Sequence, residues 1–348
     1  MKNLVMILVA IIGILAINLV IASNVIDFEP DLVLTSIPVG GEPGILCVNP
    51  STNMIYVTNY DNNTVSVING KNNSVVATIS VEKKLLAIAV NPNTNRVYVT
   101  NFTTNNTVSV INGKTDRVIK TITLETPEFY PSIVAYPDNV AVDAKTKMVY
   151  VTTADGNLVY VIDGNANKIV SIIVISNSSS GECGLGINQR TNKIYVSNVD
   201  YGTLSVLKAV SRSGKHPKAL LYNSVIATLS VGEDPYSLAV DSNTNMIYVA
   251  NYKSGTVTVI NGSNNSVIKT IKVGKWPIDI CVDSKTNMIY VANGGNNTVS
   301  VINGKSNSVV AIIPVGNMPD GICVNPKTDI VYVSSQNDDT ISVIKGLK

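Results

Sequence analysis

Residues 231–272 read VGEDPYSLAVDSNTNMIYVANYKSGTVTVINGSNNSVIKTIK, and residues 273–314 repeat the same frame as VGKWPIDICVDSKTNMIYVANGGNNTVSVINGKSNSVVAIIP. The centre of each copy is a hydrophobic residue followed by Tyr-Val, and seven such centres lie in this frame. Their tyrosines are Tyr56, Tyr98, Tyr150, Tyr195, Tyr248, Tyr290 and Tyr332, at spacings of 42, 52, 45, 53, 42 and 42 residues. Self-similarity at this period is typical of an array whose units bury their apolar faces by stacking on one another.

The first unit, residues 39–80, indicates that its elements are strands. It contains four short runs rich in Val, Ile, Thr and Tyr, which suit a pleated surface: Gly44–Val48, Met54–Thr58, Thr64–Ile68 and Ser74–Ile79. Asn-Gly at Asn69-Gly70 supplies the positive φ that a tight turn needs. Four-stranded sheets of this size, stacked around an axis, form a β-propeller with one blade per repeat.

The seventh unit starts at Val315 and ends at Lys348 without a fourth strand. The stretch DLVLTSIPV, residues 31–39, resembles the end of the first unit, SVVATISV. We therefore expect Leu32–Ile37 to supply the outer strand of the seventh blade, because such closure joins the two ends of the ring and removes an open edge. The sequence predicts an all-β fold, a seven-bladed propeller with four-stranded antiparallel blades.

The runs IYVTN, VYVTN, IYVAN and TVSVING, together with VGxxP, resemble the YVTN-family β-propeller repeat. The resemblance covers about residues 31–348. It implies similarity to propeller domains of archaeal surface-layer proteins and of some exported bacterial proteins. It implies no particular activity, because function on such scaffolds depends on sites that differ between members.

The first 30 residues differ from the repeats. Met1-Lys2-Asn3 precedes Leu4–Ala22, nineteen residues without a charge, and this pattern is typical of an export signal. The same stretch approaches the length that spans a bilayer, so residues 1–23 are read either as a cleaved signal peptide or as a retained membrane anchor. Residues 24–30 then form a linker. Both alternatives place the propeller outside the cytoplasm, at the cell surface or secreted.

The composition offers few groups for chemistry. Only 14% of residues are charged and the net charge is +2, so the basic footprint of a nucleic-acid-binding protein is absent from the sequence. The single histidine, His216, lies in the insertion Ser211–Leu221, so the chain has no cluster of histidines for a transition metal. No Ser-His-Asp set can be assembled around this loop histidine. We therefore expect no metal and no cofactor, and we assign no catalytic residue.

The cysteines fit packing better than a disulfide framework. Cys47, Cys281 and Cys323 share one frame position, where other units carry small residues such as Ala89, and cysteine behaves there as a small hydrophobe. Cys183 lies three positions earlier in its unit.

Candidate binding residues gather on the loops that connect one blade to the next. Five of these loops keep a proline, and this proline has a structural role in stiffening the loop. The side chains around it differ sharply between units, and they give the candidate ligand-binding residues Glu42, Lys84, Tyr136, Asp138, Asp234, Tyr236, Trp276 and Asp320. The links between the second and third strands share this face and add Tyr60, Phe102, Tyr201 and Tyr252. The longest loop there is Thr126–Pro137. These aromatic residues either stack on a ligand or cap the core between blades.

The sequence favours a non-enzymatic surface protein, a rigid propeller that presents one loop face to a glycan, a peptide or another surface protein. The alternative is a hydrolase or lyase that uses Glu42, Asp138, Asp234 and Asp320 as acid and base at the channel mouth. Binding of nucleic acid is a third and weaker hypothesis. The sequence leaves the ligand, the oligomeric state and the fate of the leader open.

Overall fold

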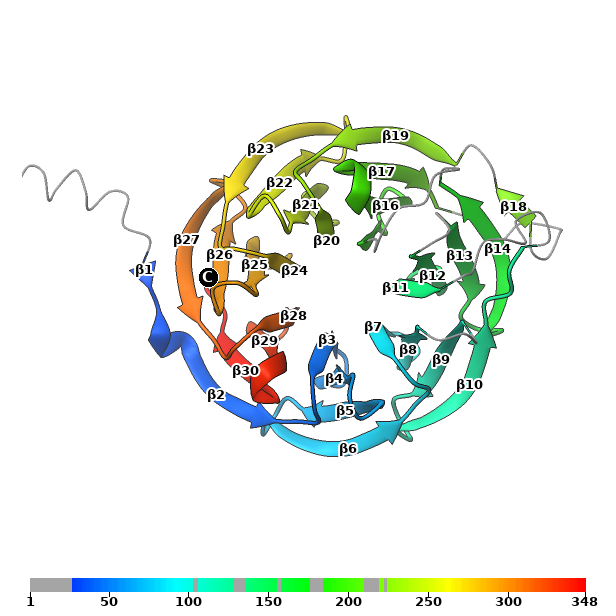
Figure 1. The fold of residues 1–348 in the computed structure, drawn as a ribbon, viewed down its shortest axis with the longest axis horizontal. Coiled ribbons are helices and arrows are strands. Elements are labelled where there is room, and N and C mark those ends of the chain that lie inside the picture. The colour runs from blue at the N-terminus through cyan, green and yellow to red at the C-terminus, as the bar shows by residue number, and fades with distance from the viewer. Residues whose placement is uncertain are drawn as a thin grey trace, which may run out of the picture.

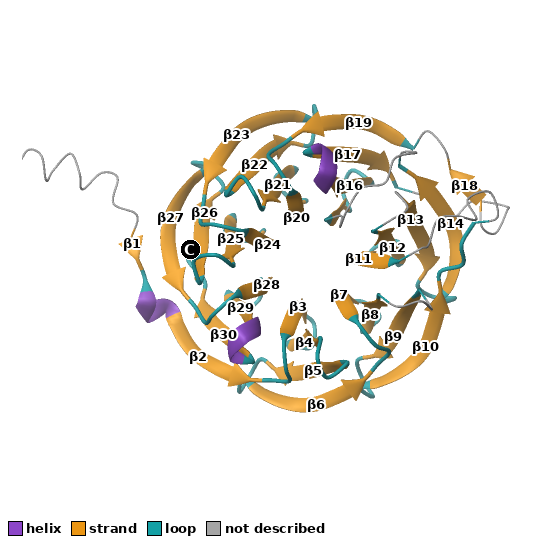
Figure 2. Cartoon of the chain, viewed as in Figure 1, coloured by secondary structure: helices purple, strands orange, loops and turns teal. Residues whose placement is uncertain are grey.

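The computed structural model is a closed ring of seven β-sheets around a central axis (Figure 1). It describes residues 27–348 except 103–105, 128–135, 155–157, 176–183, 210–218 and 222–223. Apart from strands and loops, the described residues form three short 3-10 helices, η1 (Pro30–Leu32), η2 (Val199–Tyr201) and η3 (Gln336–Asp338), as Figure 2 shows. The expected fold, a seven-bladed propeller of four-stranded antiparallel blades, is confirmed.

Each blade runs from an innermost strand at the axis to an outermost strand at the rim. Blade 1 contains β3 (Pro43–Asn49), β4 (Met54–Asn59), β5 (Thr64–Asn69) and β6 (Ser74–Ser80). Blade 2 contains β7 (Leu85–Asn91), β8 (Arg96–Asn101), β9 (Thr107–Asn112) and β10 (Arg117–Thr123). Blade 3 contains β11 (Pro137–Asp143), β12 (Met148–Thr153), β13 (Leu158–Asp163) and β14 (Lys168–Val174). Blade 4 contains β15 (Leu185–Asn188), β16 (Lys193–Asn198), β17 (Thr203–Lys208) and β19 (Val225–Ser230).

The remaining blades keep the same order. Blade 5 contains β20 (Pro235–Asp241), β21 (Met246–Asn251), β22 (Thr256–Asn261) and β23 (Ser266–Lys272). Blade 6 contains β24 (Pro277–Asp283), β25 (Met288–Asn293), β26 (Thr298–Asn303) and β27 (Ser308–Pro314). Blade 7 contains β28 (Pro319–Asn325), β29 (Ile330–Ser335) and β30 (Thr340–Lys345), and its fourth strand is β2 (Val33–Pro38) from the other end of the chain.

The closing strand lies where the sequence placed it, one residue later at each end. β2 pairs antiparallel with β30, with Ile37 opposite Ile341 and Ser36 opposite Ser342. Ile37 is 3% exposed and belongs to the cluster of buried side chains between blades 7 and 1. The ring is therefore closed by apolar packing as well as by backbone hydrogen bonds.

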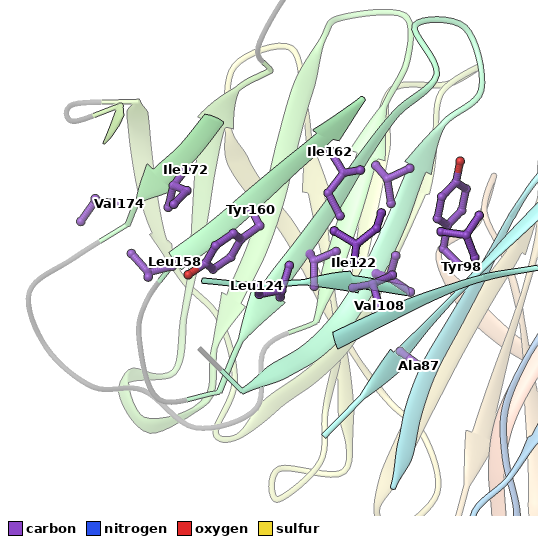
Figure 3. Close-up of a cluster of buried hydrophobic side chains, with 14 residues drawn as sticks. Ala87, Tyr98, Val108, Ile122, Leu124, Leu158, Tyr160, Ile162, Ile172 and Val174 are labelled. Carbon is purple, nitrogen blue, oxygen red and sulfur yellow. The ribbon is translucent and has the colours of Figure 1, made fainter. Parts of the chain in front are cut away.

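The repeated tyrosines hold neighbouring blades together. All seven are at most 1% exposed. The Tyr98 hydroxyl of blade 2 donates to the carbonyl oxygen of Gly164 in blade 3 at 3.4 Å, and a methyl group at Gly164 would lie 2.7 Å from that hydroxyl. A glycine in the turn after the third strand thus makes room for a tyrosine of the preceding blade. Figure 3 shows Tyr98 and Tyr160 among the buried side chains between blades 2 and 3.

Two blades carry a fifth strand that the sequence did not predict. β1 (Asp27–Phe28) pairs in parallel with β27 of blade 6, and β18 (Ala219–Leu221) pairs in parallel with β14 of blade 3. Part of the expected linker, 24–30, is therefore paired with the ring. β18 likewise comes from the end of the insertion Ser211–Leu221. In both cases the segment just before the outer strand of one blade adds to the blade before it.

Residues of the outer strands distinguish the two covered edges from the five open ones. Opposite the added strands lie Ile172, paired with Leu220, and Ile312, paired with Phe28. The five open edges carry a hydroxyl residue at this position: Ser36, Thr78, Thr121, Thr228 and Thr270. Isoleucine suits a strand edge that another strand covers, whereas threonine suits a strand face that meets water.

Replacing Ile312 by threonine is expected to loosen β1 without opening the ring. The amide N–H of Glu29 donates to the carbonyl oxygen of Ile312 at 2.9 Å, so its exchange reports this pairing. A loss of about 0.2–1 kcal/mol at this covered edge predicts an exchange rate that rises by up to about fivefold. Hydrogen exchange of Glu29 measures it. Thr270→Ile on an open edge is the control, and equal Glu29 rates in wild type and Ile312→Thr would contradict the assignment.

Candidate functional site

The proline loops and the links between second and third strands form one face of the ring. A backbone hydrogen bond joins each of these proline loops to the link between the second and third strands of the same blade. The N–H of Tyr60 donates to the carbonyl oxygen of Glu42 at 3.0 Å, and the N–H of Gly294 donates to that of Trp276 at 2.9 Å. The same pairing joins Phe102 to Lys84 at 2.7 Å. This face, called the proline-loop face below, therefore carries all eight candidate residues on one fixed frame.

In four of the five proline loops, the residue before the proline is held in the left-handed region of the backbone, and Lys84 is held likewise at the same frame position. Tyr136, before Pro137, is the exception. Among the described residues, 21 non-glycine residues have positive φ, of which twelve are asparagine and four are aspartate. Four of the five others occupy this loop position: Glu42, Lys84, Trp276 and Met318, with φ between 49° and 55°. Bulky residues are strained there, while asparagine is tolerated. Strain of this kind is concentrated at functional sites, so these side chains are candidates for binding.

A cavity of about 260 Å³ lies on the proline-loop face at the mouth of the central channel. Its lining comes from blades 1, 2, 3, 5 and 7. It includes four of the eight candidates, namely Glu42, Asp138, Tyr236 and Asp320, and also Gly44, Ile45, Thr58, Tyr60, Leu85, Leu86, Ala87, Asn139 and Gln336. The structure thus brings three of the four proposed carboxylates to one hollow.

An aromatic row extends from this cavity across the loops of blades 5 and 6. The rings of Tyr236 and Tyr252 lie 5.9 Å apart between centroids, and those of Tyr252 and Trp276 lie 6.0 Å apart at an interplanar angle of 14°. Trp276 is 47% exposed and lies close to Gly295, where a methyl group would approach its ring to 3.0 Å. Tyr236, Tyr252 and Trp276, called the aromatic row below, connect the cavity wall to the exposed indole of Trp276.

The other candidates lie apart from the row. Tyr136 stacks on Phe102 with ring centroids 5.0 Å apart. Asp234 lines a separate hollow at the rim together with Asp200 and Lys253, so it does not join the other carboxylates. Lys84 is exposed, and its backbone N–H donates to Asn63 Oδ1 at 2.9 Å. The hypothesis of four carboxylates around one mouth is therefore corrected to three.

Asp279 is a buried carboxylate that sequence reasoning missed. It lies on β24, two residues after the proline of blade 6. Its Oδ1 accepts the Ser237 hydroxyl of blade 5 at 2.7 Å, and its Oδ2 accepts the N–H of Ile322 in blade 7 at 2.8 Å. A third bond comes from the N–H of Ile280 at 2.9 Å. One side chain therefore joins three consecutive inner strands.

The stability of the ring is expected to fall with rising pH through the titration of Asp279. Burial raises the pKa of the Asp279 carboxyl, and its hydrogen bonds offset part of that rise. The folded state therefore keeps a proton that the unfolded state loses near pH 3.9, and stability is lost as pH rises through the folded pKa. Urea unfolding from about pH 4 to 8 should show this decline in wild type but not in Asp279→Asn.

Ser237→Ala is the companion variant for this titration. It removes a donor that lowers the pKa of Asp279, so the decline should move to higher pH. A decline that stays in place in Ser237→Ala, or persists in Asp279→Asn, would show that another group titrates.

The three described cysteines, Cys47, Cys281 and Cys323, are free thiols on the innermost strands of blades 1, 6 and 7. Burial raises the pKa of each thiol, which disfavours the reactive thiolate. Packing is thus the role that their environment supports.

Several sequence expectations fall outside the described residues. These are the leader Leu4–Ala22, Cys183, His216 and the centre of the loop Thr126–Pro137. Within the described ranges, no helix combines the length and apolar character needed to span a bilayer. The same part of the chain contains no group of three or more His, Cys, Asp or Glu residues arranged to hold a metal ion.

Comparisons with known proteins support the fold. No family model matches the chain, and no curated protein matches it. A chain of hydrazine synthase from Kuenenia stuttgartiensis is similar in structure, with a TM-score of 0.71 and 16% identity over 87% of this chain and 95% of that chain. Likeness at this identity extends to the fold and not to the activity. The chain is a seven-bladed β-propeller, and its resemblance to the YVTN family stays a prediction.

Proposed function

We propose that this chain is a non-enzymatic, extracytoplasmic surface protein that binds a glycan on its proline-loop face. The observation that carries the proposal is the aromatic row, which runs from exposed Trp276 through Tyr252 to Tyr236 in the wall of the channel-mouth cavity. Flat aromatic side chains offer apolar faces on which sugar rings stack. Two of its members, Tyr252 and Trp276, lie on loops of a rigid ring, the usual place for a binding site.

The backbone at Trp276 supports a functional rather than a structural role. Its φ of 53° is unfavourable for a large side chain, and asparagine would suit the position better. The neighbouring Gly295 leaves space where the indole lies. The chain thus keeps a strained, half-exposed tryptophan at a position where stability alone favours another residue.

Export is the second part of the proposal, and it rests on the apolar stretch Leu4–Ala22 after Lys2. A fusion of the full chain to a reporter that is active only outside the cytoplasm tests it. Activity that is lost when residues 1–23 are removed supports export, and reporter activity only in the cytoplasm overturns it.

Binding is tested with a glycan array probed by wild type, Trp276→Ala, Tyr252→Ala and Tyr201→Ala. Losing one anchor of the row is expected to weaken affinity for the retained glycan by about tenfold or more. Tyr201 is the control, because it is 55% exposed on the same face but is not part of the row. Retention of no glycan, or equal loss in Tyr201→Ala, would overturn the proposal.

A hydrolase with its acid and base at the channel mouth is the second candidate. It is favoured by Glu42, Asp138 and Asp320, which line one cavity. Paired carboxylates act as acid and base where their environments separate their pKa values. Incubation with the retained glycan and detection of shortened products test this. Cleavage that disappears in Asp138→Asn would replace binding by hydrolysis as the function.

A further inference from the structure

We infer that the glycan bound at the channel mouth carries protonated amino groups. This inference rests on the proposed function and names its ligand class. Among the described residues that line the cavity, the charged ones are Glu42, Asp138 and Asp320, and none is Lys, Arg or His. A hollow lined by charges of one sign concentrates ligands of the opposite sign.

Neighbouring groups hold the Asp320 carboxylate and the loop that carries Glu42. The side-chain amide of Gln336 donates to Asp320 Oδ2 at 3.1 Å. Asp138 is 8% exposed, and it follows the proline on the inner strand β11. The backbone N–H of Glu42 donates to Asp339 Oδ1 at 2.9 Å, which holds the loop that carries this residue at the lip. A carboxylate that is already oriented, as that of Asp320 is, loses little freedom when a cation binds.

Gly44 leaves room beside one of these carboxylates. A methyl group at Gly44 would lie 3.4 Å from Asp320 Oδ2 and 3.1 Å from Thr58 Oγ1. At the same frame position the second unit carries Leu86 and the fifth carries Tyr236. The absence of a side chain at Gly44 therefore keeps part of the cavity open between blades 1 and 7, next to Asp320.

An amino sugar satisfies both parts of the site. Its ring can stack on the aromatic row, and its ammonium group can donate hydrogen bonds to the carboxylates. Charge-assisted bonds of this kind are stronger than bonds between neutral groups. A neutral sugar would use the row and leave the carboxylates without a partner from the ligand. A basic peptide would engage the carboxylates but would depend less on a row of flat rings.

The test is a titration of the full chain with two oligosaccharides of equal length. One is a glucosamine oligomer and the other is its N-acetylated counterpart, which is neutral. At about pH 5.5, below the pKa of an amine, the cationic oligomer is expected to bind about tenfold tighter or more. This preference should shrink in Asp320→Asn and in Glu42→Gln and should fall as salt is added.

The outcomes separate the inference from the function on which it rests. Equal binding of both oligomers would overturn the amino-sugar inference and leave glycan binding intact. Binding of neither oligomer, together with an empty glycan array, would overturn both. Oligolysine that binds as tightly as the glucosamine oligomer and is unaffected by Trp276→Ala would assign the site to a basic peptide instead.

Gly44→Leu provides an independent check. It installs the bulk that Leu86 provides in the second unit, so it should block the cavity and reduce affinity for the cationic oligomer by about tenfold or more. Its unfolding midpoint shows whether the ring is intact. An intact Gly44→Leu ring with unchanged affinity would contradict binding at this cavity.

Discussion

A chain that begins at Gly40, and so lacks β1 and β2, is expected to lose the cooperative unfolding of the ring. Without β2, the outer edge of β30 is unpaired, and the buried cluster between blades 7 and 1 loses Ile37. Units that depend on their neighbours are least stable at a free end, and an exposed strand edge also promotes aggregation. Urea unfolding and size-exclusion chromatography, compared with a chain that begins at Asp27, measure the effect.

Point variants test the same closure without a deletion. Ile37→Ala removes a side chain that is 3% exposed and should cost about 2–4 kcal/mol. Leu34→Ala lies on the same strand at a bulge, where the side chain is 53% exposed, and should cost less than about 0.5 kcal/mol. Closure by β2 would be contradicted if the chain from Gly40 unfolded at the same midpoint as the chain from Asp27.

The blades and their closure could be predicted from sequence because each strand ends at a local signal. Asn-rich turns recur at fixed positions, and twelve asparagines have positive φ. The expectation that Asn69-Gly70 supplies the positive φ of its turn was wrong, because that conformation lies at Asn73 and Gly70 instead leaves space for the Tyr332 hydroxyl. The match between residues 31–39 and the end of the first unit placed β2 within one residue. Local turn residues and repeated spacing are enough to predict the strands where every unit packs against its neighbours in the same way.

The added strands β1 and β18 could not be predicted in this way, because their pairing depends on a blade distant in the chain. β18 has three residues and β1 has two, which is too short for a period of two to be recognised. The signal that could have indicated them lies on their partners. Ile172 and Ile312 stand where the other units carry threonine or serine, and that substitution indicates a covered edge.

The candidate site was predicted in part, and the geometry of a ring explains the remainder. Residues directly after the proline, such as Asp138, Tyr236 and Asp320, lie on innermost strands and reach the cavity. Four of the five residues directly before it are held by a left-handed turn, and of these Glu42 lines the cavity while Asp234 lines the rim hollow. A shared frame position therefore gives a shared face but not a shared pocket.

Asp279 was missed because its frame position does not stand out. Other units carry Ile45, Ala87, Ser237 and Gly321 there. Because this position varies so widely between units, an aspartate at it gives no sign of a special role. Its three donors come from blades 5, 6 and 7, and no single repeat contains them. Aligning the units with one another shows which residues share a frame position, but it does not show which residues of different units are in contact.

The repeated tyrosines are buried between blades, whereas loop tyrosines such as Tyr201 are exposed. Replacing a buried tyrosine is expected to have a large effect on stability. Tyr332 is fully buried in the cluster between blades 7 and 1, so Tyr332→Ala should cost about 3–5 kcal/mol. Tyr201→Ala, at a residue that is 55% exposed, should cost less than about 0.5 kcal/mol. Midpoints of urea unfolding at a common pH compare the two.

The hydroxyl of Tyr332 adds a second, finer test of the contact between blades. A methyl group at Gly70 of blade 1 would lie 2.9 Å from that hydroxyl and 2.7 Å from Asn53 Oδ1. Asn53 cannot easily move, because its Oδ1 accepts the side-chain amide of Asn325 at 2.6 Å. Gly70→Ala should therefore destabilise the ring by about 1–3 kcal/mol, and Tyr332→Phe should recover part of that loss in the double variant. Additive effects in this cycle would mean that tyrosine and glycine do not meet across the blades, and the repeated Tyr-Val and Asn-Gly would then need separate explanations.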